Sequence, residues 1–454
     1  MKMKRIPPAI DFGALTRRRF LRGMMAATVA ANPLLSKLAR AGAPAGSTPA
    51  EYTNGFMLPQ TQSSGLLAQY LSSEHLDYDL DGWFFFGSLI EGSGRAPDPA
   101  NIGAYFMAVQ RIDQVIDGFR VPVVPAIVAF NGAATDGYIV GGSINLDIAP
   151  VVTVTPSPWS VEVVCLDSNL QSTGGMTMTR VSGQVGRPGA IYRLVSDTLG
   201  GDGHRTQTDV TIRDRMGAVN EGHGPASFFP QWITPHQREQ IDGSYHGSVD
   251  AYLRASGNAM VSQGSYYYSE PLLEVQKFVI SRDDVGIVSQ GNAGTLWLDY
   301  VVETYNARAA QVVKNCSWHF FALQFPQQLG ALMVLEVITT TMGSFPVATY
   351  FQRPGGQTRN GALSAKKSWG INEIAIAPVV SSLWTSPVSG VSYYLSNTIQ
   401  LGRDKLVVTM LRENQEIVVG TASKYEGMAM VQGTLNGQAI EGTGWVELQP
   451  VPQA

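Results

Sequence analysis

Short runs in which apolar and polar residues alternate recur along the chain, and a period of two is typical of β-strands with one buried face. Turns rich in glycine and proline separate them, in keeping with 48 glycines, 25 prolines and only 15% charged residues among 454. The pattern predicts an all-β fold with almost no helix. The clearest predicted strands cover 81–89, 104–112, 138–154, 159–166, 176–181, 190–196, 207–214, 249–253, 265–269, 295–300, 317–325, 331–338, 381–386, 392–399, 405–412, 417–419, 429–435 and 444–448.

The strand pattern resets around residues 256–265. The length predicts more than one domain, and we expect an N-terminal β-domain at 44–255 and a C-terminal one at 256–454, each an antiparallel barrel or a strongly curved sandwich. A glycine-rich and aromatic segment at 220–232 precedes the reset. It is either a loop pinned by aromatic packing or a lid over a cavity mouth.

The first 43 residues resemble an export signal. The segment 16–22, Thr-Arg-Arg-Arg-Phe-Leu-Arg, matches the twin-arginine pattern, and a mild apolar run and small residues suited to cleavage follow it. We therefore expect the twin-arginine translocase as a partner and a periplasmic or secreted destination. A basic amphipathic helix is the alternative. Removing residues 1–43 takes away nine basic residues and one acidic residue, which changes the formal net charge from −4 to −12.

This charge and the sparse metal ligands exclude several classes of function. An acidic mature chain without a cluster of Lys and Arg argues against nucleic acid and anionic membrane surfaces as partners. The two cysteines and six histidines show no metal-ligand spacing, so we expect no metal and no cofactor. Cys165 and Cys316 form either a disulfide, which an oxidising compartment permits, or two buried free thiols.

The segment 291–338 is where the sequence hints at chemistry. Alternate side chains of a strand share a face, so the predicted strand at 295–300 places a carboxylate, Asp299, beside Trp297 and in line with Glu303. His319 lies among aromatic residues in the predicted strand at 317–325. A carboxyl group in an apolar cavity has a raised pKa and can serve as an acid. The alternative is a structural role for Asp299, as the partner of an arginine such as Arg308 in an ion pair.

Several segments, taken in order, resemble the family of carotenoid 1,2-hydratase (hydroxyneurosporene synthase) and kievitone hydratase. Trp83 to Leu89 resembles its aromatic opening, and Tyr266 to Ser269 its central Tyr-Tyr-Ser strand. Trp297-Leu298-Asp299 and residues 318–325 are similar to its paired Trp-x-Asp and Trp-x-Trp-Phe-x-x-Gln-Leu strands. The stretches 414–416, 425–427 and 442–448 resemble its closing segment. The resemblance extends from about residue 51 to 450.

The resemblance implies two consecutive lipocalin-like (calycin) antiparallel barrels packed together. It also implies a hydro-lyase that adds water to an alkene of a hydrophobic isoprenoid or prenylated substrate. Asp299 would then be the catalytic acid, and His319 or Glu303 would orient the water. The expected aromatic residues of the substrate site are Trp297, Tyr266, Tyr268, Trp318 and Trp83.

Two departures from the family concern this site. The carotenoid enzymes have a tyrosine at the position of Trp297, and a His-x-Trp pair where this chain has Tyr266 and Tyr268. These changes argue against a carotenoid substrate and leave open a prenylated or terpenoid substrate or no reaction at all. The alternative function is a carrier that holds a lipophilic molecule or lipid in a barrel without altering it; a pericyclase is a third possibility. Glu426 is expected to tie the final strand to the barrel.

Overall fold

The computed structural model describes residues 80–92, 98–116, 119–133, 135, 137–146, 151–156, 158–167, 169–223, 243–244, 265–303, 316–339, 343–353, 364–369, 373–419 and 422–450. The expected export signal, the strand expected at 249–253 and Arg308 lie outside these ranges. Strands and three short 3-10 helices, Pro99–Asn101, Pro326–Gln328 and Val380–Ser382, make up the named elements. None of the described helices has the length and hydrophobicity needed to cross a membrane. The all-β prediction is confirmed.

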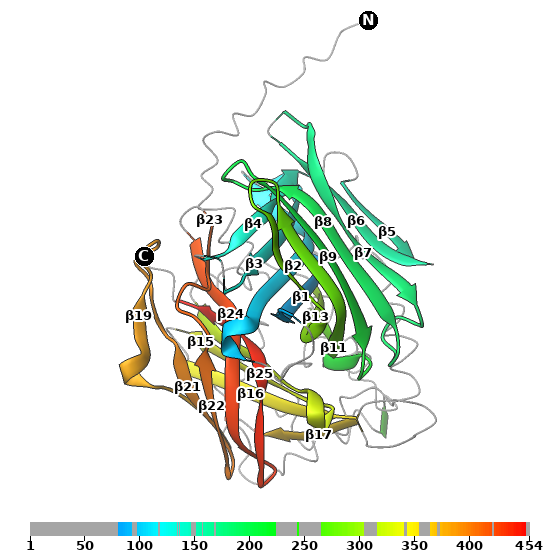
Figure 1. The fold of residues 1–454 in the computed structure, drawn as a ribbon. Coiled ribbons are helices and arrows are strands. Elements are labelled where there is room, and N and C mark those ends of the chain that lie inside the picture. Colours follow the sequence, from blue (N-terminus) through cyan, green and yellow to red (C-terminus); the bar gives the residue numbers. More distant parts are fainter. Residues whose placement is uncertain are drawn as a thin grey trace, which may run out of the picture.

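The first sheet is a curved, wholly antiparallel sheet of thirteen strands (Figure 1). Its main path runs β4-β3-β2-β1-β13-β11-β9-β8-β7-β6-β5, and β10 and β12 pair with β11. Its strands are β1 (Leu80–Ile90), β2 (Ile102–Ile116), β3 (Phe119–Asn131), β4 (Ile139–Leu146), β5 (Val152–Pro156), β6 (Trp159–Leu166), β7 (Ser172–Ser182), β8 (Ile191–Leu199), β9 (Arg205–Asp214), β10 (Val219–His223), β11 (Ser265–Arg282), β12 (Gly286–Gly291) and β13 (Ala293–Glu303).

The second sheet has ten antiparallel strands, drawn in yellow to red in Figure 1. Its path runs β17-β16-β15-β14-β25-β24-β22-β21-β18, with β23 paired to β24 and a separate hairpin of β19 and β20. The ten strands of the sheet are β14 (Cys316–Phe325), β15 (Gly330–Thr339), β16 (Gly343–Gln352), β17 (Ser364–Trp369), β18 (Ile374–Pro378), β21 (Ser396–Leu401), β22 (Asp404–Met410), β23 (Glu416–Val419), β24 (Ala422–Leu435) and β25 (Gln438–Gln449). The hairpin consists of β19 (Leu383–Thr385) and β20 (Ser392–Tyr394).

The change from one sheet to the other falls between Glu303 and Cys316. Strands β11 and β13 follow the expected domain boundary at 255/256, yet they pair with β9 and β1 of the first sheet. The division between sheets therefore does not coincide with that boundary. Two curved antiparallel sheets in succession agree with the expected pair of lipocalin-like barrels.

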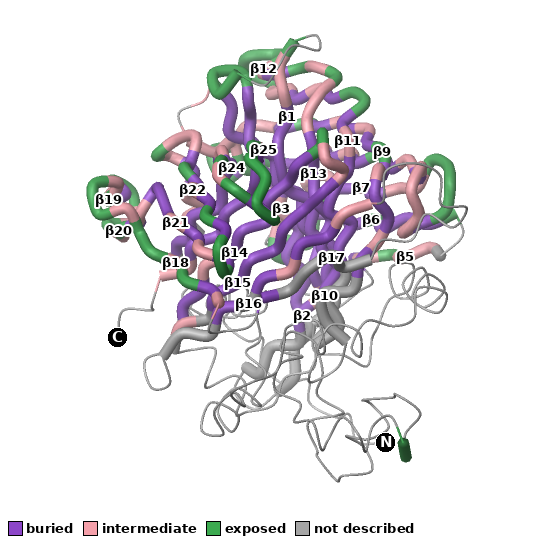
Figure 2. The backbone as a smooth tube through the Cα atoms, turned by 90° about the horizontal axis from the view of Figure 1, so that it is seen from below, coloured by how far each residue is buried: buried purple, intermediate pink, exposed green. Residues whose placement is uncertain are grey.

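Three clusters of buried apolar side chains hold the molecule together. One lies within the first sheet and includes Trp83, Trp159 and Tyr192; another lies within the second sheet and includes Tyr425. The third, here called the shared cluster, draws on both sheets. In Figure 2 the buried stretches, in purple, include β1, β13 and β25, which contribute to it. Its largest members are Phe84, Phe86, Phe106, Trp297, Trp318, Phe320, Phe351 and Trp445.

Two glycines let β1 and β13 approach closely next to the strand segment that carries Asp299. A Cβ on Gly87 would lie 2.3 Å from the carbonyl oxygen of Thr295, and a Cβ on Gly294 would lie 2.2 Å from that of Ser88. Their φ angles of 146° and 133° are values that residues with a side chain rarely adopt. Glycine is therefore required at both positions.

The structure decides between a disulfide and a free thiol for Cys165. Its side chain is a free, buried thiol on β6. Burial raises the pKa of this thiol, although a hydrogen bond with Ser143 opposes the rise. It is therefore a structural core residue of the first sheet, and the disulfide alternative does not hold for it.

Candidate functional site

Alternation along β13 places a carboxylate in the shared cluster. Trp297 and Val301 belong to this cluster, whereas Leu298 and Tyr300 belong to the first sheet's own core. Asp299 lies between Trp297 and Val301 on the same face and is only 4% exposed. The predicted face of β13 is confirmed for these residues.

Hydrogen bonds from Ser269 and Trp297 help to orient the Asp299 carboxyl group. The hydroxyl of Ser269, which lies directly opposite on β11, donates to Oδ1 at 2.6 Å. The indole Nε1 of Trp297 donates to the same oxygen at 2.5 Å. Buried hydrogen bonds of this kind fix the orientation of a group, because its surroundings offer little competing water.

Phe86 of β1 connects this carboxylate with the second sheet. Its ring stacks on Trp297 with centroids 6.4 Å apart and an interplanar angle of 13°. It also lies 5.5 Å from Trp445 of β25 and meets Phe320 of β14 edge-on at 6.3 Å. Aromatic faces attract cations, most strongly where water is excluded. The shared cluster therefore joins a carboxylate to rings that can stabilise a positive charge.

The second sheet contributes a buried ion-pair group to the same cluster. Lys424 forms ion pairs with Glu426 and, at 3.2 Å from Oε2, with Glu447. Each carboxylate also accepts from an indole: Trp445 Nε1 donates to Glu426 at 2.7 Å, and Trp318 Nε1 donates to Glu447 at 3.0 Å. The Lys424 ammonium lies 5.7 Å from the centre of the Trp318 ring. All three charged residues are less than 10% exposed.

Burial and mutual charge change the proton affinity of this group. Burial raises the pKa of Glu426 to about 8, and the charge of Glu447 adds to the rise while Lys424 opposes it. Burial by itself would lower the pKa of Lys424, but the two carboxylates outweigh burial and raise it. Lys424 and Glu426 therefore bind their protons more tightly than isolated side chains would.

Only some of the aromatic residues expected in the site meet there. Trp297 and Trp318 both belong to the shared cluster. Trp83 lies on the other face of β1, in the core of the first sheet, where it stacks on Tyr300 with centroids 5.2 Å apart. The structure therefore does not place Trp83 in the shared cluster with Trp297.

The other expected site residues lie elsewhere or beyond the described side chains. His319 alternates with Trp318 and therefore lies on the other face of β14, where its Nδ1 is 2.9 Å from Glu336 Oε2. The structure does not bring it to the shared cluster. The backbone of Glu303 ends β13, and Tyr266 and Tyr268 pair with this strand from β11. The side chains of these three residues are outside the described part.

A second buried acid pair was not anticipated from the sequence. Glu270 of β11 accepts from the hydroxyl of Tyr192 at 2.8 Å, and Asp214 of β9 accepts from the amides of Met216 and Gly217, both at 2.7 Å. Burial raises the pKa of Glu270 well above its usual value, with the charge of Asp214 as the next cause. Burial also raises the pKa of Asp214 to about 6. The two carboxyls are therefore suited to share a proton.

The ion-pair group of the second sheet corresponds to a recognisable sequence pattern, in which residues two positions apart lie on one face of a strand. Lys424-x-Glu426 and Trp445-x-Glu447 each place two polar or aromatic side chains on one face of a strand, as Trp297-x-Asp299 does. The expectation that Glu426 ties the final strand is confirmed by its bond to Trp445. No short spacing connects Asp214 with Glu270, so sequence pattern could not reveal that pair.

Comparison with known proteins finds similarity at the level of structure. No protein-family model and no curated protein sequence matches the chain. A candidate AttH protein from Nitrosomonas europaea has a similar fold, with a TM-score of 0.53 and 16% identity over 84% of this chain and 95% of that one. Kievitone hydratase from Nectria haematococca has a TM-score of 0.45 and 12% identity over 81% and 88% of the two chains. CghA in complex with Sch210972 has a TM-score of 0.42 and 11% identity over 82% and 89%.

The AttH likeness concerns the fold, and it extends over both sheets. The fold expected from the sequence resemblance is confirmed.

Proposed function

We propose that this protein is a hydratase that adds water to a carbon–carbon double bond of a hydrophobic isoprenoid or prenylated molecule. The reaction would take place at the junction of the two sheets. The observation that carries the proposal is the buried Asp299 carboxyl, which an indole N–H orients within an aromatic cluster. Hydration of a trisubstituted alkene needs these two features, a proton donor and surroundings that stabilise a cation.

The proposed chemistry begins with transfer of a proton from Asp299 to the less substituted alkene carbon. The electron pair of the double bond forms the new C–H bond and leaves a tertiary cation. The faces of Trp297 and Phe86 stabilise this cation. A water oxygen then bonds to the cationic carbon and loses a proton to the Asp299 carboxylate, which restores the acid.

The ion-pair group of the second sheet has a positioning role in this proposal. Lys424 engages one oxygen of Glu426 and Trp445 the other, so this carboxyl is committed to neighbouring donors. Glu447 similarly holds the indole of Trp318. We therefore assign proton transfer to Asp299 and orientation of the tryptophan rings to Glu426 and Glu447.

Export through the twin-arginine pathway is a second part of the proposal and rests on residues 16–22. Replacing both Arg17 and Arg18 with lysine should leave the protein in the cytoplasm of a bacterial host, as cell fractionation would show. Export of the doubly substituted protein at the level of the unchanged protein would contradict this assignment.

Native mass spectrometry of the purified protein, with organic extraction of any bound molecule, tests the proposed reaction. A bound isoprenoid or prenylated aromatic compound should gain one labelled oxygen when it is incubated with the protein in heavy-oxygen water. A bound lipid that is recovered unlabelled and unaltered would favour the carrier and contradict the hydratase.

A further inference from the structure

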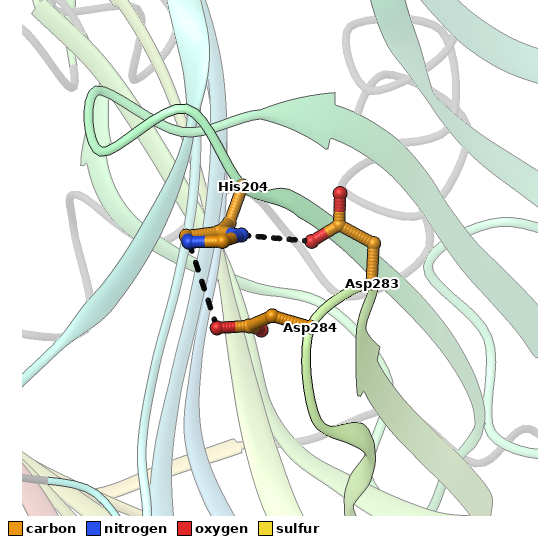
Figure 3. A group of neighbouring side chains, drawn as sticks. All are labelled: His204, Asp283 and Asp284. Atoms are coloured by element: carbon orange, nitrogen blue, oxygen red, sulfur yellow. Dashed lines mark hydrogen bonds and ion pairs between the residues drawn. The ribbon is translucent and has the colours of Figure 1, made fainter.

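A histidine and two aspartates meet on two turns of the first sheet that the proposed function does not use. His204 ends the turn between β8 and β9, and Asp283 and Asp284 begin the turn between β11 and β12. Figure 3 shows the imidazole between the two carboxylates. Its Nδ1 lies 3.1 Å from Asp283 Oδ1, and its Nε2 lies 3.6 Å from Asp284 Oδ2. The ligand atoms of the three residues all lie within 4.8 Å of one another.

The arrangement places an electron-rich atom on each side of one ring. A neutral imidazole has a single N–H and can donate to only one of the two carboxylates. If Nδ1 donates to Asp283, the lone pair of Nε2 faces an oxygen of Asp284. Two such atoms repel each other unless a positive charge lies between them. The site therefore calls for a cation or an added proton.

We propose that His204 and Asp284 bind a divalent transition metal ion such as Zn²⁺, with Asp283 orienting the histidine. Zinc binds imidazole nitrogen and carboxylate oxygen at about 2.0–2.2 Å, so two such ligands at a tetrahedral angle lie roughly 3.4 Å apart. The 3.6 Å between Nε2 and Asp284 Oδ2 fits this geometry. Both side chains are partly exposed, which allows water to complete the coordination shell.

The role of Asp283 follows from a common feature of metal sites. A histidine that binds a metal through one nitrogen usually donates its other N–H to a carboxylate, which fixes the tautomer and the ring orientation. The Nδ1 to Asp283 contact of 3.1 Å supplies this partner. Asp283 is therefore the orienting carboxylate of the site.

Neighbouring side chains hold the ligands in place. Arg282 lies 2.9 Å from Asp284 Oδ1 and 3.0 Å from Asp202 Oδ2, so it links the two turns. Asp202 Oδ1 in turn accepts from the backbone amide of His204 at 3.0 Å. Because Arg282 contacts Oδ1 of Asp284, it leaves the assignment of Oδ2 to the metal unchanged.

The metal would cross-link two turns at one end of the first sheet. The β8–β9 turn also meets the edge strand β4 through an isolated bridge between Gly141 and Gly200. A metal ion would link the β8–β9 turn to the β11–β12 turn. It would thereby stabilise the end of the sheet at which β4 contacts the β8–β9 turn. Since metal bound only to the folded state stabilises that state, zinc should raise the melting temperature.

Equilibrium dialysis of the tag-free full-length protein against Zn²⁺ tests the proposal. We expect His204→Ala and Asp284→Asn to remove one zinc ion per chain from the bound total. Asp283→Asn should weaken binding about tenfold, as expected for loss of an orienting carboxylate. Zinc should raise the melting temperature of the unchanged protein and not that of His204→Ala.

Asp209→Asn is the matched control, because Asp209 is a partly exposed carboxylate on β9 that pairs with Arg193. It should bind zinc as the unchanged protein does. Equal zinc binding by the unchanged protein and His204→Ala would place the metal elsewhere and overturn the proposal. Absence of zinc binding in the unchanged protein would also overturn it.

Discussion

Trp297 and Asp299 lie two residues apart on one face of β13, and the indole of Trp297 donates to the carboxylate at 2.5 Å. The second sheet presents a matching pair, in which Trp445 of β25 donates to Glu426 of β24 at 2.7 Å. Phe86 contacts both tryptophans. The two sheets therefore meet through aromatic rings that each hold a buried acid, an arrangement with several testable consequences.

Loss of the Trp297 N–H should destabilise the fold without removing the aromatic ring. Trp297→Phe removes one buried hydrogen bond to Asp299, and such a bond contributes about 0.5–1.5 kcal/mol, or up to about 3 kcal/mol where the acceptor is charged. Chemical denaturation would measure the loss in free energy of unfolding. Trp384→Phe on β19, whose side chain is only half-buried, is the control and should change stability less. Equal effects of the two substitutions would argue against the importance of the indole N–H.

Phe86 should be a key packing residue between the sheets, since it contacts Trp297, Phe320 and Trp445. Phe86→Ala leaves a cavity in the shared cluster and should lower the free energy of unfolding by about 3–5 kcal/mol. Phe86→Leu retains most of the volume and should cost less. Denaturation curves of the two variants test this order, and an alanine variant as stable as the leucine variant would contradict it.

Gln324 of β14 ties the second sheet to the first. Its Nε2 donates to the carbonyls of Leu296 and Pro271 at 2.8 and 2.9 Å, and its Oε1 accepts from the Thr295 hydroxyl. Gln324→Leu leaves these buried groups without their partner and should cost at least 1–3 kcal/mol, roughly the penalty for one such group. The exposed Gln432→Leu is the control. Similar stability of the two variants would mean that water replaces the glutamine.

The Asp214–Glu270 pair should make stability fall as the pH rises. The folded-state pKa of each carboxyl is raised, so the folded protein retains protons that the unfolded chain releases. The contribution of this pair to the free energy of unfolding is therefore greatest below the unfolded-state pKa values near 4. It falls above them by about 1.4 kcal/mol per pH unit for each such group. For Asp214 the fall ends near pH 6, whereas for Glu270 it continues to higher pH.

Glu270→Gln should flatten this dependence, because glutamine can accept from Tyr192 and does not ionise. Urea denaturation at pH 5 and pH 8 should show that the variant loses less stability between the two values than the unchanged protein. Glu274→Gln, on the same strand but partly exposed and paired with Arg215, should behave like the unchanged protein. The same pH slope in Glu270→Gln and the unchanged protein would show that Glu270 ionises normally.

The sequence was sufficient for the fold class and for the faces of single strands. Alternation placed Trp297 and Asp299 together, and it placed His319 on the same face as Phe321. Such local arrangements follow from the strand period alone. The strand period does not predict which cluster each face joins, because it does not say which face of β14 meets the other sheet. Trp318 turned out to face the shared cluster, whereas His319 faces away from it.

Pairing between distant strands explains what could not be predicted. β1 lies between β2 and β13, and β13 follows it by about two hundred residues in the chain. No local signal specifies such a partner. The same holds for the acids, since Glu270 meets Tyr192, and His204 meets Asp283, only after the sheet has formed. The resemblance, which spans both halves of the chain, implied two successive curved antiparallel sheets but none of these individual pairings.

The most direct test of the central claim is the rate of water addition by Asp299→Asn, measured with the substrate identified by mass spectrometry. The asparagine oxygen can still accept from Ser269 and Trp297, so the variant should fold and bind the molecule. Without the acid, incorporation of labelled oxygen should fall about 100-fold or more. Turnover at the unchanged rate would remove Asp299 from the mechanism and contradict the account.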